Sequence, residues 1–267
     1  MPKSESKKDT KQVLKSSKLY RKLKLLSAHF LYKKHLKAIA DLKVAVHLHL
    51  YYIDLLDEFI ENLKNIPIPF DLYITLVERP ASDIKKIFQT FPNAKIFTLP
   101  NQRNDIGAFV EVINNINLNA YDALIKIHSK KSLHTGAEQK EWRQRLVKTL
   151  IGSPKQVTTV LYEFCDKKTG MVGGYEDLCF AEYEDKQVFT DLCEKLEVDA
   201  DNIFFKGTMF VIRPKILSRL VEKGMRLNDF EPILNGKLAY AMERVFGSLC
   251  INQGYKIKAL EPILIKK

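Results

Sequence analysis

Residues 101–132 read NQRNDIGAFVEVINNINLNAYDALIKIHSKKS and predict a helix followed by an apolar strand. Polar residues gather where the helix begins, at Asn101, Arg103, Asn104, Asp105 and Gly107. A second polar cluster follows the apolar run 123–127, at His128, Ser129, Lys130, Lys131 and Ser132. Ligands of open α/β sheets bind beyond the carboxyl ends of strands and at helix N-termini. Both clusters are therefore expected at one ligand-binding edge.

Outward from this stretch, strand and helix patterns alternate. Before it come strand patterns at 43–52, 70–76 and 94–100, separated by helix patterns at 54–66 and 82–91. After it come helices at 138–150, 154–164 and 236–253, with strands at 171–174, 203–214 and 254–265. The strand at 203–214 is expected to be interrupted at Gly207. This alternation predicts an α/β fold with a mainly parallel sheet of a nucleotide-binding type and helices on both faces.

The charge is concentrated at the N-terminus. Residues 1–43 contain 13 basic and 3 acidic residues, so this segment carries +10 of the total net charge of +11. We expect a basic arm at residues 1–42 and a single domain at residues 43–267. The nearly neutral domain argues against nucleic acid as a partner.

The arm contains a helix pattern with apolar positions at Leu19, Leu23, Leu26 and Phe30, and again at Leu36 and Ile39. Lysines fill other faces, which predicts a basic amphipathic helix within residues 13–42. Such a helix lies in the headgroup region of an anionic membrane, or it docks on the domain or on a neighbouring subunit. The pattern does not separate these alternatives.

The remaining composition narrows the class of protein. The four cysteines form no CxxC pair, which indicates reduced thiols. No apolar run reaches the roughly 18 residues of a membrane span, and no signal-peptide pattern follows the first lysines. A cytoplasmic protein is expected. The sequence also has no G-x-S-x-G, Walker A or G-x-G-x-x-G motif, so hydrolase, ATPase and dinucleotide-binding functions are not indicated.

Several uncommon motifs resemble the rhamnan synthesis F family: NDIGAF at 104–109, KIHSKKS at 126–132, Trp142 with Arg143, GTMFVIRP at 207–214 and LAYAMERVFG at 238–247. The resemblance covers about residues 43–260. It implies a GT-A-like glycosyltransferase that moves a sugar, with rhamnose as the expected sugar and dTDP-rhamnose as the expected donor, to a lipid-linked glycan of a lipopolysaccharide or cell wall. It also implies a place at the inner face of the cell membrane.

The resemblance assigns roles to individual residues. Sugar transfer needs a base for the acceptor hydroxyl and positive charge for the departing diphosphate. Glu243 is the expected base, Asp105 is expected to bind donor hydroxyls, and His128 is the third expected catalytic residue, as a hydrogen-bond donor. The expected donor and diphosphate ligands are Asn104, Gly107, Lys130, Lys131 and Arg244. The expected acceptor-side residues are Gly207, Thr208, Trp142 and Arg143.

A metal ion cannot be carried over from the resemblance. His128, Ser129 and Lys130 stand where GT-A enzymes have an Asp-x-Asp motif, so Mg²⁺ or Mn²⁺ is left open and the lysines are expected to supply the charge. His47 and His49 share one face of a strand, but without a third ligand nearby packing is the expected role.

Simpler interpretations stand beside these roles. Asp105 could only cap its helix, Glu243 and Arg244 could form a surface ion pair, and Gly207 with Thr208 could be a strand bulge. The lysines could belong to a solvated loop. For the whole chain, the alternative is a membrane-docked scaffold or sugar-nucleotide-binding protein without catalysis.

Overall fold

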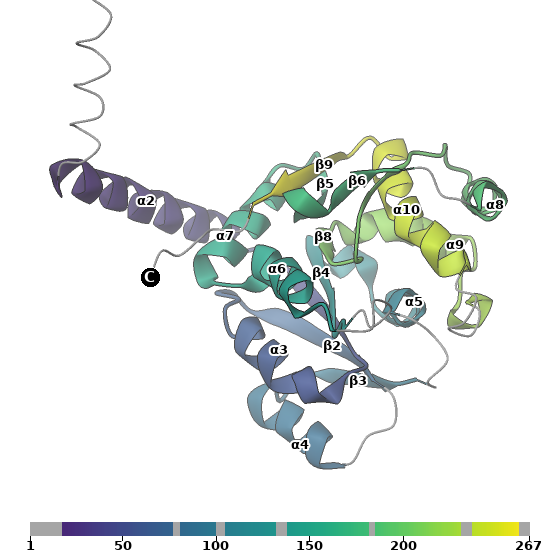
Figure 1. Cartoon of the computed structure of the whole chain (residues 1–267), viewed down its shortest axis with the longest axis horizontal. Coiled ribbons are helices and arrows are strands. Elements are labelled where there is room, and N and C mark those ends of the chain that lie inside the picture. The colour runs from purple at the N-terminus through teal and green to yellow at the C-terminus, as the bar shows by residue number, and fades with distance from the viewer. Residues whose placement is uncertain are drawn as a thin grey trace, which may run out of the picture.

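The computed structural model describes residues 18–76, 81–99, 105–131, 138–181, 185–230 and 237–261. Its first half alternates strands with helices, and the predicted polar stretch forms a helix and a strand (Figure 1). The elements are β1 Val44–Leu50, α3 Leu56–Leu63, β2 Phe70–Leu76, α4 Ala81–Thr90, β3 Lys95–Thr98, α5 Asp105–Asn115 and β4 Ala123–His128. The helix predicted in this stretch is confirmed from Asp105 onward. Asn101, Arg103, Asn104 and Ser132 lie outside the described residues.

The second half is less regular. Its elements are α6 Lys140–Ile151, α7 Pro154–Tyr162, β5 Thr169–Gly174, β6 Leu178–Phe180, α8 Lys186–Leu196, β7 Ile203–Phe205, β8 Phe210–Ile212, α9 Ser218–Glu222, α10 Lys237–Asn252 and β9 Lys256–Leu260. Short 3₁₀ turns join several of these elements. The predicted break between α6 and α7 is confirmed, because the Ser153 hydroxyl accepts the Gln156 N–H and Pro154 takes the first helical position.

In the described part of the chain, seven strands form one sheet in the order β3-β2-β1-β4-β8-β5-β9. Six strands run in the same direction, and only β8 runs antiparallel to its neighbours β4 and β5. The predicted mainly parallel sheet is therefore confirmed. The predicted interruption at Gly207 of the strand at 203–214 is confirmed, because β7 and β8 lie on either side of it. Strand β7 lies outside the main sheet and pairs with β6.

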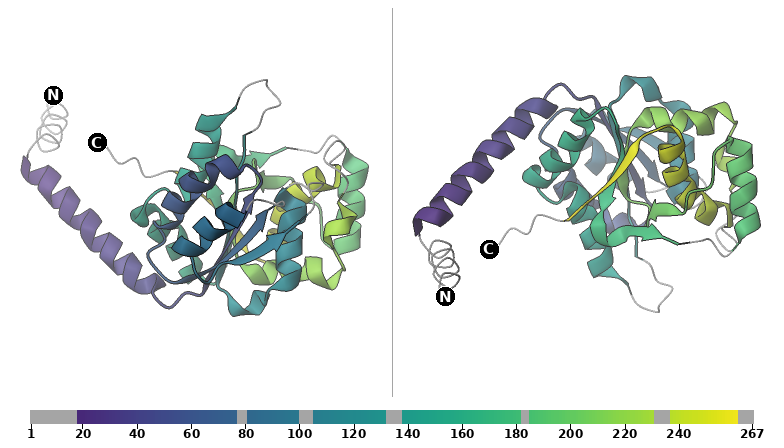
Figure 2. Two further views of the ribbon diagram at one scale, coloured as in Figure 1. Left: turned by 90° about the horizontal axis from the view of Figure 1, so that it is seen from below. Right: turned by 90° about the horizontal axis from the view of Figure 1, so that it is seen from above.

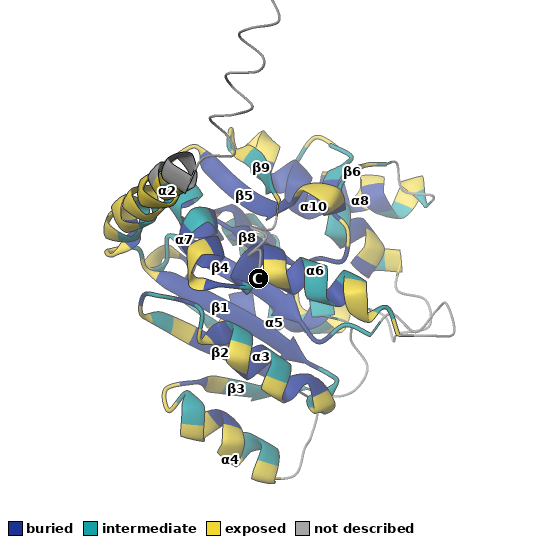
Figure 3. Cartoon of the chain, turned by 60° about the vertical axis from the view of Figure 1, so that its left-hand side comes forward, coloured by how far each residue is buried: buried dark blue, intermediate teal, exposed yellow. Residues whose placement is uncertain are grey.

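Helices cover both faces of the sheet, as predicted (Figures 1 and 3). One apolar core lies between the sheet and helices α3, α6 and α7, with Phe59, Leu146 and Val157 among its members. The other core lies under α5, α8, α9 and α10 and includes Phe109 and Val245. Strand β1 is buried along its whole length, which its near-continuous apolar sequence requires.

The basic arm contains helix α2, Lys18–Ile39, as predicted. The expectation that lysines and apolar residues occupy different faces is wrong, because Lys22, Lys33 and Lys37 lie on the same side of the helix as Leu26 and Phe30. Its C-terminal end packs on α7, where the His35 ring stacks on Tyr162 at 3.7 Å between centroids and Ile39 is fully buried. The rest of α2 projects away from the domain in all three views (Figures 1 and 2). None of the helices among the described residues could cross a bilayer.

Candidate functional site

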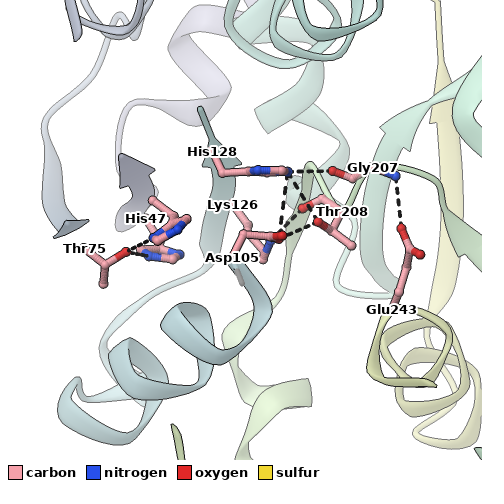
Figure 4. A network of polar contacts seen from close by, with 9 residues as sticks. His47, Thr75, Asp105, Lys126, His128, Gly207, Thr208 and Glu243 are labelled. Carbon is pink, nitrogen blue, oxygen red and sulfur yellow. Dashed lines mark hydrogen bonds and ion pairs between the residues drawn. The ribbon is translucent and has the colours of Figure 1, made fainter. Parts of the chain in front are cut away.

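The candidate site lies at the carboxyl ends of β1 and β4, where the N-terminus of α5, the turn between β7 and β8, and helix α10 meet (Figure 4). Parallel register places His47 beside Lys126 and His49 beside His128. Because side chains alternate along a strand, all four point to the face that α5 covers. Polar groups therefore meet inside an otherwise apolar layer.

Asp105 and Lys126 form the centre of this network. The Lys126 ammonium is fully buried, 2.5 Å from Oδ2 of Asp105, and it also donates to the Thr208 carbonyl at 2.8 Å. The rings of Phe109 and Phe210 lie 5.5 and 5.8 Å from the ammonium. Burial of a lysine in such surroundings requires an anion as partner, and Asp105 is that partner.

The charge of Asp105 is fixed by this contact. Burial alone would raise the pKa of the carboxyl group, but the Lys126 ammonium and the hydrogen bonds from Lys126 and Thr208 outweigh burial and hold the pKa well below its usual range. Asp105 is the first residue of α5, and its carboxylate contacts residues 21 and 103 positions away in the sequence. The carboxylate therefore has a tertiary role that helix capping alone does not provide.

A strained turn closes the other side of the network. Gly207 and Thr208 have φ angles of 83° and 51°, and a β-branched residue such as Thr rarely adopts a positive φ. A side chain at Gly207 would lie 2.9 Å from Leu146 and 3.1 Å from Trp142, so glycine is required there. The Thr208 hydroxyl donates to Asp105 at 2.6 Å and helps to hold this turn.

The same turn joins the two other expected catalytic residues. Nε2 of His128 lies 2.8 Å from the Gly207 carbonyl, and the Gly207 N–H donates to Oε1 of Glu243 at 3.0 Å. The turn at Gly207 is therefore not a strand bulge that lacks contacts with other residues. It connects His128 on β4 with Glu243 on α10 through one residue.

Glu243 is largely enclosed, with 15% of its side chain exposed. Burial raises its pKa, the negative charge of Asp105 adds to this effect, and the Gly207 hydrogen bond opposes it. The closest guanidinium nitrogen of Arg244 is 4.0 Å from Oε2, and Arg244 also donates to the Tyr240 carbonyl and lies over the ring of Phe204. Glu243 is thus more than a member of a surface ion pair.

Three buried histidines complete the polar layer. The Thr75 hydroxyl bridges Nε2 of His47 at 2.9 Å and Nδ1 of His49 at 3.0 Å. Burial lowers the pKa of His49 to about 4 and of His128 to about 3, and it lowers that of His47 well below its ordinary value. All three rings are neutral at pH 7, and His128 acts as a neutral hydrogen-bonding group.

The two neighbouring lysines at the end of β4 have different surroundings. The Lys130 ammonium lies 4.7 Å from the Trp142 ring centroid, and among the described residues no carboxylate oxygen lies within 4 Å of it. The Lys131 ammonium is paired with Asp54 at 2.6 Å and lies over Tyr52. Lys130 is therefore the better placed of the two to bind an added anion.

Comparison with known proteins agrees with the motifs in the sequence. The family model for rhamnan synthesis protein F matches residues 10–255. The chain belongs to the rhamnan synthesis protein F family. The polar network around Asp105 is therefore a candidate functional site in a family named for polysaccharide synthesis.

Curated relatives of this family member include the uncharacterized protein WxcX from two strains of Xanthomonas campestris pv. campestris. In each, WxcX is 25% identical over 237 residues, which are 85% of this chain and 34% of WxcX. The chain thus spans about a third of the length of these relatives.

Solved structures similar to the chain include glucosyl-3-phosphoglycerate synthase from Mycobacterium tuberculosis. Its complex with Mn²⁺, UDP and glucosyl-3-phosphoglycerate has a TM-score of 0.41 and 11% identity, and covers 86% of this chain and 74% of the synthase. Its complex with phosphoglyceric acid has a TM-score of 0.40 and 11% identity, and covers 88% and 76%. At this level of similarity these structures do not define ligands for this chain.

The remaining expected site residues lie in different surroundings. Gly107 lies buried within α5, and Trp142 packs beside Gly207. The guanidinium of Arg143 instead pairs with Glu58 and Glu138 and donates to the Lys130 carbonyl at 3.2 Å. Arg143 therefore holds the loop that carries Lys130.

Two residues of the site, Lys126 and Asp177, were not predicted from the sequence. The available signal for Lys126 was that it interrupts the apolar run of β4. Asp177 is buried and accepts hydrogen bonds from Trp142 Nε1 at 3.1 Å and from Arg145 at 2.7 Å, which holds the indole beside the site. Among the described residues, no group of three His, Cys, Asp or Glu side chains is arranged to hold a metal ion.

Proposed function

We propose that this member of the rhamnan synthesis protein F family transfers a sugar from a nucleoside-diphosphate donor to a cell-surface polysaccharide. Rhamnose is the proposed sugar, dTDP-rhamnose the proposed donor, and a lipid-linked glycan at the inner face of the membrane the proposed acceptor. The observation that supports the proposal is the turn Gly207–Thr208. The enclosed carboxylate of Glu243, with its raised pKa, accepts from its backbone, and Trp142 packs beside it and carries the Lys130 ammonium over its ring.

In this proposal the acceptor hydroxyl attacks the anomeric carbon while the bond from that carbon to the diphosphate oxygen breaks. Glu243 takes the hydroxyl proton, a role that suits a carboxylate whose pKa is raised toward neutral pH. The diphosphate leaves with the electron pair, and the Lys130 ammonium offsets its growing charge. The Lys126 ammonium is already paired with Asp105, so Lys126 positions that carboxylate.

Asp105 binds hydroxyls of the donor in this mechanism. Its Oδ2 accepts from Lys126 and Thr208, and 17% of the side chain remains exposed. The described carboxylates do not fit a divalent ion well, because Oδ2 of Asp105 already accepts two hydrogen bonds and Glu243 accepts the Gly207 N–H. The lysine supplies the charge that a metal would otherwise provide.

Donor binding can be measured through Trp142, the single tryptophan of the chain, which lies beside Lys130. Its fluorescence would be titrated with dTDP-rhamnose, dTDP and UDP-glucose, first with EDTA and then with Mg²⁺ or Mn²⁺. We expect selective binding of one donor in EDTA. Lys130→Ala should weaken binding by about tenfold or more, since a hydrogen bond to a charged group contributes about 1.5–3 kcal/mol.

Lys131→Ala is the matched control, because its ammonium is already paired with Asp54. We expect it to change the donor dissociation constant by less than about threefold. Equal effects of the two substitutions would contradict the assignment of Lys130, and binding only with added metal would contradict a lysine-based diphosphate site.

Glu243→Gln separates catalysis from binding. The amide oxygen can still accept the Gly207 N–H, so folding and donor affinity should be retained. Release of nucleoside diphosphate in the presence of a lipid-linked glycan fraction should slow by about 10²–10⁴-fold if Glu243 is the base. An unchanged rate would remove Glu243 from this role. Donor binding without turnover in the wild type would favour the non-catalytic scaffold.

A further inference from the structure

Helix α2 has one face that packs on the domain. Successive residues of an α-helix are turned by about 100°, so Tyr32, Leu36 and Ile39 lie on the same side. Ile39 is fully buried, and Tyr32 and Leu36 are half-buried. Together with the stacking of His35 on Tyr162, these contacts fix the C-terminal part of α2 on α7.

A second face of α2 points away from these contacts. Leu26 and Phe30, four residues apart, are 56% and 69% exposed. Lysines three, four or seven residues from them share this side of the helix. We call this surface the outward face; it consists of Lys22, Leu26, Phe30, Lys33, Lys34 and Lys37. The remainder of α2 carries other exposed apolar residues, including Leu31 at 50%.

The charge of α2 restricts what can cover the outward face. Residues 18–39 include no Asp or Glu, so the partner must supply the negative charge. Pairing with α2 of a second copy would place lysine against lysine, which is unfavourable. A layer of anionic lipid headgroups meets both requirements, because phosphates contact the lysines while Leu26 and Phe30 enter the boundary with the acyl chains.

We propose that the outward face of α2 binds an anionic membrane surface, with the helix lying in the headgroup layer and the domain held on its other side through α7. The projection of α2 from the domain leaves the helix accessible along most of its length (Figure 2). This proposal does not depend on sugar transfer, because it concerns lipid binding by the helix alone.

The test is sedimentation of the full chain with vesicles of phosphatidylcholine containing phosphatidylglycerol, compared with vesicles of phosphatidylcholine alone. We expect binding to the anionic vesicles that weakens as salt is raised. Replacing Lys33, Lys34 and Lys37 together by Gln should reduce the partition coefficient by about a hundredfold at low salt, because each lysine contributes about 1 kcal/mol.

Leu26→Ser and Leu31→Ser form a matched pair, since both leucines are exposed on the same helix and only Leu26 belongs to the outward face. Leu26→Ser should reduce binding about tenfold, and Leu31→Ser should change it little. Both variants should keep the wild-type melting temperature. Equal losses in the pair, equal binding to neutral vesicles, or no binding to anionic vesicles would each overturn the proposal, and the last result would favour an acidic protein partner.

Discussion

The two faces of the central strands differ in chemistry although both are buried (Figure 3). On the face toward α3 and α6, β1 presents Val44, Val46, Leu48 and Leu50, all apolar. On the face toward α5, β1 begins with Ala45 and continues with two histidines, and β4 changes from leucine to lysine and histidine. The change occurs in the carboxyl half of both strands.

The face toward α5 departs from the composition that stability alone favours. A buried parallel strand is most stable with apolar side chains on both faces, and each buried polar group needs a partner. The apolar face follows that rule. The other face departs from this rule where the polar side chains of β1 and β4 meet α5 and the turn at Gly207, within the candidate site.

The largest expected effect is on stability and concerns Lys126. Lys126→Met would leave the enclosed Asp105 carboxylate without its ammonium, and we expect a loss of about 3–5 kcal/mol in the free energy of unfolding, measured by denaturant titration. The double variant with Asp105→Asn should lose less than the sum of the two single variants. Additive losses would show that the two side chains do not act as a pair.

The polar face should also make stability depend on pH. In the unfolded chain a histidine takes up a proton near pH 6.5, whereas His49 and His128 in the folded chain resist protonation until about pH 4 and 3. Between these values the unfolded chain binds more protons, so stability falls as the pH falls from 6.5 toward 4. Melting temperatures measured across this range should decrease steadily.

His49→Gln should make this decrease smaller, because one of the buried rings is removed. His29→Gln, which changes an exposed histidine on α2, is the matched control and should leave the pH dependence as it is. If the two variants behave alike, the buried histidines are not the source of the pH dependence.

The smallest effect is expected on the apolar face. Ile127 lies between Lys126 and His128 but points into the apolar core on the other side. Ile127→Val removes one methylene group and should cost about 0.5–1.5 kcal/mol of stability. Donor affinity, measured by Trp142 fluorescence, should stay at the wild-type value. A large loss of donor affinity would mean that the two faces are not independent.

Much of the fold could be predicted from the sequence because it depends on local patterns. The alternation of strands and helices, the helix in the basic arm, the break at Ser153–Pro154 and the position of the polar clusters at strand ends all follow from periodicity and capping. The pairing of β7 with β6 outside the main sheet was not predictable in this way, because strand pairing depends on residues distant in the chain.

The candidate site was predicted in its position and only partly in its contacts. His128, Gly207, Thr208 and Glu243 come together as one network, as expected of residues with a common site. Tertiary structure alone decided that Asp105 pairs with Lys126, that Arg143 serves an ion-pair network with Glu58, and that Lys130 rather than Lys131 lacks a described carboxylate partner. The physical reason is that sequence periodicity fixes which way a side chain points, whereas its partner depends on the register between strands and helices that are distant in the chain.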